Sequence, residues 1–243
     1  MREYRFYVTK ENIKGDMVTL DGDEHNHLSK VLRLNIGDEV TIISNDNLVR
    51  DCVINNISKR DTILDIISTQ PVEEDLPDVT LFQALIRADK MDIVVQKCTE
   101  LGVKEVIPFE SKFCTVQDKG NKLDRLNRIV LASCKQSGRL SAMNIHKTLQ
   151  FNELLTKLSE YDYVIFANEK ESVGASSILG QLNRNSKIAI IVGCEGGFST
   201  QEAQSLIDLG AKSISLGKLI LRAETASIAL ISTIMYTIGE WER

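Results

Sequence analysis

Three glycines lie within five residues directly after a predicted strand, which makes this loop a candidate ligand site. Residues 187–192 predict an apolar strand that is buried on both faces of a sheet. The glycines that follow, Gly193, Gly196 and Gly197, let backbone N–H groups approach a ligand closely. Ser199 and Glu202 have the spacing of a capping box, so the loop leads into a helix N-terminus, which suits an anion or a polar group. A tight turn without a ligand explains the glycines equally well, and their spacing matches neither the dinucleotide motif nor the phosphate loop.

A second stretch, residues 215–226, brings polar side chains to the start of an apolar helix. Its apolar residues and free backbone groups could form a slot for an adenine-like ring, because small-molecule sites combine apolar walls with a few polar anchors. Arg222 could act on a ligand there, or it could simply form an ion pair with Glu224. Glu169 follows another predicted strand, 163–167, and open α/β sheets bind their ligands beyond the carboxyl ends of strands.

Strands and helices alternate after residue 79, which predicts a mostly parallel sheet covered by helices. The predicted strands are 79–86, 103–109, 163–167, 187–192 and 213–216. The predicted helices are 90–101 (capped by Asp89 and ended by Gly102), 122–137, 151–158, 201–209 and 224–240. The final helix is apolar enough to be buried in a core, in a dimer interface, or partly in each.

The first 70 residues have a different pattern, of short β-rich segments separated by turns. One helix, residues 24–34, would place Leu28, Val31 and Leu32 on one face. Short strands at this spacing indicate a small β-barrel. Residues 70–78 carry two prolines and a run of acids and are the natural linker, so we predict domains at 1–72 and 73–243.

Composition narrows the class of protein. The formal net charge of −5 counts weakly against a nucleic-acid partner, so an RNA-binding chain would have to gather its positive charge on one face. Five cysteines are scattered without a C-x-x-C pair or a Cys/His cluster, which suggests neither a disulfide framework nor a metal site. Cys98 and Cys134 fall within helix patterns and are expected in the core. No apolar run is long enough to span a membrane, and we expect a cytoplasmic protein.

Taken together, the motifs resemble those of the SPOUT methyltransferases. Within that group the chain is similar to the RsmE family, which methylates N3 of a uridine in the 16S ribosomal RNA of the bacterial small subunit. The resemblance spans the whole chain, and the C-terminal motif is its most specific part. It is carried by residues 5–8, 25–34, 90–92, 96–102, 135–139, 193–199 and 215–226. One departure is Cys194, where the family usually has proline, and it leaves the glycine loop less rigid.

The resemblance implies an α/β fold with a parallel sheet and a deep trefoil knot, a PUA-like barrel at the N-terminus, and a homodimer. It also implies that three loops hold S-adenosylmethionine, with no metal. The implied cofactor-binding residues are Phe166, Ala167, Val192, Gly193, Glu195, Gly196, Gly197, Leu216, Gly217, Leu219, Ile220, Leu221, Glu224, Thr225 and Ala226. For RNA the candidates are Arg2, Arg5, Lys30, Arg33, Arg87, Lys90, Arg128, Lys135 and Arg139, each of which taken alone is more often a solvated surface charge.

The implied reaction needs a group that stabilises an anionic base and a group that takes the proton of N3. We expect Arg222 to stabilise the developing negative charge. Glu169 and Glu195 are candidate general bases, and either could instead bind the cofactor. We further expect Arg5, Arg33 and Arg139 to line an RNA track. Two alternatives stay open: a SPOUT enzyme that modifies transfer RNA, and a non-catalytic RNA-binding protein of the same fold.

Overall fold

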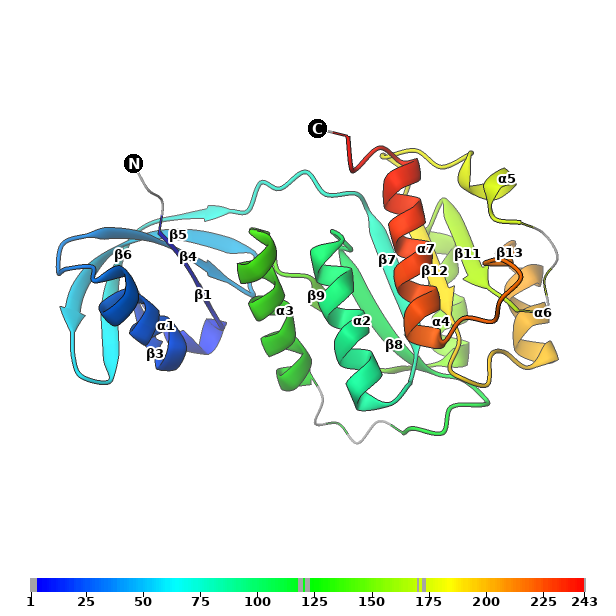
Figure 1. Cartoon of the computed structure of the whole chain (residues 1–243), viewed down its shortest axis with the longest axis horizontal. Coiled ribbons are helices and arrows are strands. Elements are labelled where there is room, and N and C mark those ends of the chain that lie inside the picture. Colours follow the sequence, from blue (N-terminus) through cyan, green and yellow to red (C-terminus); the bar gives the residue numbers. More distant parts are fainter. Residues whose placement is uncertain (1–3, 118–119, 121–122, 170, 172–173, 243) are drawn as a thin grey trace. The chain divides into compact units, whose positions relative to one another are not determined.

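The computed structural model of the protein describes residues 4–117, 120, 123–169, 171 and 174–242. The chain divides into two compact units (Figure 1). The first unit comprises Met1–Asp75 and Val130–Ala142, and the second comprises Leu76–Ile129 and Met143–Arg243. Helix α3 (Leu123–Ser137) therefore contributes residues to both units.

A six-stranded sheet forms the first unit, in the order β1-β4-β5-β6-β3-β2. Strand β1 pairs in parallel with β4, and the other neighbours pair antiparallel. The strands are β1 (Arg5–Val8), β2 (Ile13–Lys14), β3 (Met17–Asp21), β4 (Glu39–Ser44), β5 (Leu48–Ile57) and β6 (Asp61–Pro71), with a short 3-10 helix, η1 (Lys10–Asn12), between β1 and β2. Phe6, Leu20, Ile42 and Leu64 are among the fully buried side chains of its core. These elements confirm a β-rich N-terminal part, although the sequence pattern did not predict β1, β2 or η1.

The helix predicted at residues 24–34 has an irregular form. It begins as α1 (Gly22–Asn26) and continues as a π-helix, η2 (His27–Leu32), which ends at Arg33 in the left-handed conformation. A π turn holds more residues than an α turn, so side chains at helical spacing drift away from a common face. Leu28 is fully buried, whereas Val31 is 68% exposed. The prediction that Val31 shares the buried face was therefore wrong.

The second unit contains a parallel sheet in the order β10-β8-β7-β12-β11-β13, with β9 paired to β8. Its strands are β7 (Val79–Ala84), β8 (Glu105–Glu110), β9 (Asn144–Ile145), β10 (Leu149–Gln150), β11 (Tyr163–Ala167), β12 (Ile188–Val192) and β13 (Lys212–Ile214). Every residue of β12 is buried, as predicted for a strand covered on both faces. The observed sheet confirms the predicted α/β class.

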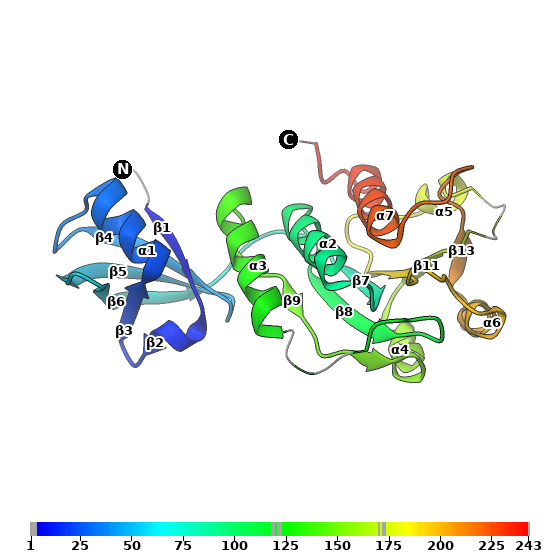
Figure 2. The same cartoon turned by 60° about the horizontal axis from the view of Figure 1, so that its bottom comes forward.

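Helices cover both faces of this sheet. The helices of the second unit are α2 (Ala88–Glu100), the first part of α3, α4 (Phe151–Lys157), η3 (Leu158–Glu160), α5 (Ser176–Leu179), α6 (Thr200–Asp208) and α7 (Ala223–Thr237). Figure 2 shows α2 and α7 on one side of the sheet and α4 and α6 on the other. Helices α2 and α7 pack against each other, and α7 also packs on β12.

Most helix and strand predictions agree with the structure to within a few residues, but α5 was not predicted and some other details differ. Helix α2 begins at Ala88 after Arg87, so Asp89 lies in the first turn and does not cap the helix. Its carboxylate lies 3.3 Å from the guanidinium of Arg87. Strands β9 and β10 are two residues each, too short to give a periodic signal.

Candidate active site

A cavity of about 430 Å³ opens where β11, β12 and β13 end at their carboxyl termini. These three strands are neighbours in the sheet, so the loops that follow them meet. Among the predicted residues, those lining the cavity are Ala167, Glu169, Val192, Gly193, Glu195, Gly196, Gly197, Leu216, Gly217, Leu219, Ile220, Leu221, Arg222 and Ala226. The cavity is also lined by residues that were not predicted but would have been included had each loop been taken whole: Asn168, Cys194, Ser215, Lys218 and Ala223.

Three predicted cofactor residues do not line the cavity. Phe166 is fully buried in the sheet and lies edge-on to Phe198, with 5.8 Å between the ring centroids. Glu224 is buried, and Thr225 is exposed elsewhere on α7. All three are next to a cavity residue in the sequence, and spacing alone does not reveal which way a side chain points.

The glycine loop is packed so closely that side chains would not fit. A Cβ atom on Gly197, whose φ is +65°, would lie 2.9 Å from Oε1 of Glu169. A Cβ on Gly196 would lie 2.8 Å from Cβ of Phe113, and one on Gly193 would lie 3.2 Å from the backbone of Gly197. The glycines therefore serve close packing around the cavity as well as turning the chain.

The capping box predicted for the next helix is present. Ser199 Oγ accepts a hydrogen bond from the backbone N–H of Glu202 (3.3 Å), and Glu202 Oε2 accepts one from the N–H of Ser199 (2.9 Å). Glu202 Oε1 also accepts a bond from the N–H of Lys112, at 2.8 Å. Glu202 thus ties the segment after β8 to the start of α6.

A buried amide supports the glycine loop from inside the protein. Gln83, at the end of β7, is fully buried, and its Nε2 donates to the carbonyl oxygens of Ala84 (3.1 Å) and Gly193 (3.5 Å). The hydroxyl of Ser227, on α7, donates to Gln83 Oε1 at 2.5 Å. Sequence reasoning missed this pair, although a glutamine within an otherwise apolar strand and a serine within an apolar helix were visible signals.

The loop that follows β13 supplies apolar side chains to the cavity. Gly217 has a φ of +111°, and Ser215 Oγ accepts a hydrogen bond from its N–H at 3.3 Å. Leu219 and Ile220 are 80% and 85% exposed, and both line the cavity. Apolar walls beside backbone groups are the usual composition of a small-molecule site.

Arg222 and Glu224 do not pair with each other. Glu224 is only 9% exposed and binds Lys90, with 3.2 Å between Oε1 and Nζ. Arg222 is exposed at the N-terminus of α7, lines the cavity, and has no ion pair among the described residues. The alternative in which Arg222 is only a structural partner of Glu224 is therefore wrong, because Glu224 forms its ion pair with Lys90.

The predicted RNA residues are distributed over both units, and they differ in exposure. In the first unit Arg5, Lys30 and Arg33 are exposed, and Lys135 pairs with Glu24 at 2.6 Å. Arg139 is only 6% exposed, and its Nε donates to Ser141 Oγ at 3.4 Å. A buried guanidinium cannot reach a phosphate, so the predicted track of Arg5, Arg33 and Arg139 lacks its third member in this conformation.

In the second unit, Arg87 and Arg128 are exposed and Lys90 is engaged with Glu224. Arg2 lies outside the described residues. In the part of the chain that the structure describes, no helix is both long and apolar enough to cross a membrane. The described residues also include no group of three His, Cys, Asp or Glu side chains that could hold a metal ion.

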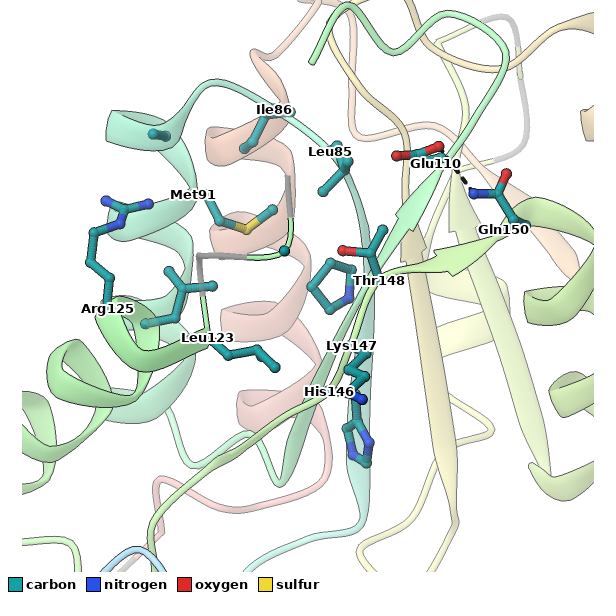
Figure 3. Close-up of a pocket in the computed structure, with 14 residues that line it drawn as sticks. Leu85, Ile86, Met91, Glu110, Leu123, Arg125, His146, Lys147, Thr148 and Gln150 are labelled. Atoms are coloured by element: carbon teal, nitrogen blue, oxygen red, sulfur yellow. Dashed lines mark hydrogen bonds between the residues drawn. The ribbon is translucent and has the colours of Figure 1, made fainter. Parts of the chain in front are cut away.

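A larger cavity, of about 480 Å³, lies elsewhere in the second unit (Figure 3). Its walls include Leu85, Met91 and Leu123, with Arg125 and His146 among its polar residues. None of the predicted cofactor residues lines it. Since the predicted glycine loop lines the other cavity, we place the candidate active site in the cavity of about 430 Å³.

Comparisons with known proteins identify the family of the chain. A family model described as the RNA methyltransferase domain matches residues 73–235, and one described as the RNA methyltransferase PUA domain matches residues 20–67. The ribosomal RNA small subunit methyltransferase E of Bacillus subtilis is 30% identical, and the alignment covers 97% of this chain and 96% of that protein. The protein of the same name from Rickettsia conorii is 31% identical, covering 96% of each chain.

A solved structure leads to the same family. The ribosomal RNA small subunit methyltransferase E of Neisseria gonorrhoeae, bound to S-adenosyl methionine, is 29% identical and superposes with a TM-score of 0.76, covering 97% of this chain and 98% of that one. The match of the methyltransferase model to most of the chain, together with the full-length relatives, assigns the fold and the enzyme class. The chain belongs to the RNA methyltransferase family, and its N-terminal part contains the family's PUA domain.

Proposed function

We propose that this enzyme transfers a methyl group from S-adenosylmethionine to N3 of one uridine in the 16S ribosomal RNA of the small subunit. The observation that carries the proposal is the three-loop cavity with Arg222 on its wall. Relatives named for the small ribosomal subunit match nearly the whole chain, which supports this substrate over transfer RNA.

The cavity has the properties that S-adenosylmethionine needs. Its volume of about 430 Å³ lies within the range of small-molecule sites. Leu219 and Ile220 offer apolar walls for the adenine, and the glycine loop brings its backbone to the cavity wall. When bound, the cofactor supplies a methyl group on a positively charged sulfur, which a nitrogen lone pair can displace in line.

The residues of the chain position the base and handle its proton. Arg222 faces the cavity and would stabilise the negative charge that develops on uracil as N3 loses its proton. Glu169 and Glu195 both line the cavity and are exposed, so each is placed to take that proton or to bind cofactor hydroxyl or amino groups. We keep both assignments in the proposal. Holding donor and acceptor in line supplies much of the rate acceleration.

In this proposal both domains contact the RNA: the barrel of residues 1–72 and the methyltransferase domain of residues 73–243. Arg5, Lys30 and Arg33 are exposed in the first unit, where phosphate contacts would orient the RNA. The proposal includes the trefoil knot, the homodimer and a cytoplasmic location. An exposed aromatic pair near the chain's C-terminus, Tyr236 and Trp241, offers apolar surface for a second copy.

The direct test is methyl transfer from labelled S-adenosylmethionine to small subunits purified from cells that lack this gene. We expect labelled 3-methyluridine at a single position in the 16S RNA. Label in transfer RNA but not in the subunits would replace the proposed substrate. Binding of RNA without binding of S-adenosylmethionine would replace the enzyme with a non-catalytic RNA-binding protein.

A further inference from the structure

Two cysteines that lie 80 positions apart in the sequence are brought to one serine beside the cavity. Cys194 is the second residue of the glycine loop, and Cys114 lies in the segment after β8. Ser111 Oγ is 3.3 Å from Cys114 Sγ and 3.8 Å from Cys194 Sγ. The remaining cysteines (Cys52, Cys98 and Cys134) are buried at other places in the fold.

The two thiols differ in their surroundings, and this difference makes Cys114 the more reactive of the two. Cys114 is half-buried, so a small oxidant can reach it, and its sulfur accepts a hydrogen bond from the N–H of Ser111 at 3.4 Å. The neighbouring Cys194 thiol, together with hydrogen bonds from Ser111, lowers the pKa of Cys114 despite its partial burial. The proximity of Cys114, together with burial, raises the pKa of Cys194 well above its ordinary value. Cys114 is thus the thiol that ionises more readily, and Cys194 is the one that holds its proton more firmly.

The segment that carries Cys114 is already attached to the glycine loop. The Phe113 side chain fills the space that a Cβ on Gly196 would occupy, and the N–H of Lys112 is bound by Glu202. On its own side, Cys194 donates from Sγ to the carbonyl of Gly197 at 3.9 Å, and its carbonyl accepts from the N–H of Gly197 at 2.9 Å. A covalent bond at this point would therefore act directly on the backbone that lines the cavity.

We propose that Cys114 and Cys194 form a reversible oxidation site. The disulfide between them would displace the backbone of the glycine loop and thereby weaken cofactor binding. The effect on the cofactor rests on the proposed function; the disulfide itself does not. Because Phe113 already touches Gly196, the loop cannot follow Cys194 toward Cys114 without moving the residues that line the cavity.

The chemistry needs a peroxide as oxidant and balances in two steps. The Cys114 thiolate attacks one oxygen of hydrogen peroxide and breaks the O–O bond, which gives a sulfenic acid and, after protonation of the departing hydroxide, one water. The Cys194 sulfur then attacks the Cys114 sulfur, the S–S bond forms, and the hydroxyl leaves with the Cys194 proton as a second water. The two sulfurs lose two electrons in total, and the peroxide gains them. A dithiol reverses the change by exchange.

The test exposes the full-length protein to hydrogen peroxide and maps its disulfides by mass spectrometry under non-reducing conditions. We expect a peptide pair linked through Cys114 and Cys194, and an S-adenosylmethionine Kd about tenfold higher, equivalent to the loss of roughly 1.4 kcal/mol. Dithiothreitol should restore both. Cys114→Ser should bind the cofactor like the reduced protein, and its Kd should not change after peroxide treatment. Cys134→Ser removes a thiol outside the site and should respond to peroxide like wild type.

Any of three results would overturn the proposal. One is a peptide map in which both thiols stay free after peroxide treatment, and another is a linked pair with an unchanged Kd. Equal peroxide sensitivity of Cys114→Ser and wild type would do the same. If the reduced protein had no affinity for S-adenosylmethionine, the proposed function would fail, yet the peptide map would still decide whether the pair oxidises.

Discussion

Arg222 and Glu224 stand two residues apart at the start of α7, and their side chains have opposite surroundings. Glu224 is buried against Lys90, while Arg222 reaches the cavity. From the sequence alone, an ion pair between Arg222 and Glu224 was favoured over a ligand-binding role for Arg222, since the competing partner of Glu224 lies on another helix. The structure resolves this at the level of single side chains: Glu224 pairs with Lys90, while RNA binding by Lys90 stays a prediction.

Replacing Lys90 should therefore affect stability first. Lys90→Met leaves the Glu224 carboxylate buried without its cation, and we expect a loss of about 3 kcal/mol in the free energy of unfolding. Urea denaturation measures it. The control is Lys97→Met on the same helix, whose pair with Glu100 is more exposed and should matter by less than about 1 kcal/mol. Unchanged stability with weakened RNA affinity would restore the original assignment of Lys90.

Arg222→Ala should separate chemistry from binding. If Arg222 stabilises charge on the base, the methyl-transfer rate at saturating cofactor should fall by about 10²–10³-fold, as for the loss of one charge-stabilising donor. The cofactor Kd, from calorimetry, should stay within about threefold, since the interaction forms in the transition state. Lys218→Ala removes another cation from the cavity wall and should cost much less rate. Equal losses of rate and affinity in Arg222→Ala would make it a binding residue only.

At the scale of elements, the loops depend on backbone conformations that only certain residues adopt without strain. Gly197 combines a left-handed φ with close approach to Glu169, and the hairpin turn between β4 and β5 places Asn47 at a φ of +58°. Glycines and capping residues are local signals, and the predicted glycine loop and capping box agree with the structure, whereas the predicted cap at Asp89 does not. The π-helix at His27–Leu32 had no such signal, so the orientation of Val31 was predicted wrongly.

Gly197→Ala tests the close packing of the glycine loop. The new Cβ would push the Glu169 carboxylate aside, and we expect cofactor affinity to fall at least about tenfold, or 1.4 kcal/mol. Gly210→Ala is a matched control, because Gly210 also has a positive φ but has open space around its Cβ position. Both variants carry backbone strain of about 1–2 kcal/mol in thermal unfolding. Equal cofactor affinity of the two would contradict the assigned loop geometry.

The β4–β5 turn should make the stability of the first unit depend on pH. Burial alone would raise the pKa of Asp46, but hydrogen bonds from Arg50 and Ser44 outweigh it, and the pKa is lowered. A carboxyl with a lowered pKa stabilises the fold above its unfolded pKa of about 4, and this contribution disappears as the pH falls through the folded value.

Asp46→Asn removes this ionised partner of the buried Arg50. We expect it to cost about 3 kcal/mol at pH 7, measured by urea unfolding followed by signals from the first unit. The difference from wild type should shrink as the pH is lowered toward 3. A difference that is constant from pH 7 to pH 3 would mean that the ionised carboxylate is not what stabilises the turn.

For the whole molecule, sequence patterns were sufficient for the class of fold and for the loops that form the cavity. Both follow from short-range signals: alternation of strands with helices, and glycines after a buried strand. Contacts between segments that are distant in the sequence could not be predicted from such short-range signals. They include the Lys90–Glu224 pair, the Gln83 amide beneath Gly193, the burial of Arg139 and the meeting of Cys114 with Cys194.

The described residues also line several cavities of similar size, with volumes of about 480, 430 and 440 Å³, and only one of them should hold the methyl donor. Volume does not distinguish them, since all lie in the range of small-molecule sites. The distinguishing features are the glycine loop and Arg222, which belong to the cavity of about 430 Å³. The assignment of the active site therefore depends on where S-adenosylmethionine binds.

Amide hydrogen exchange of the full-length protein, with and without S-adenosylmethionine, tests this most directly. The account predicts slower exchange on cofactor addition in peptides covering residues 167–169, 193–197 and 215–226. Residues 85–91 and 146–150 of the larger cavity should exchange as before. Protection of those segments instead, with the three loops unchanged, would contradict the assignment of the active site.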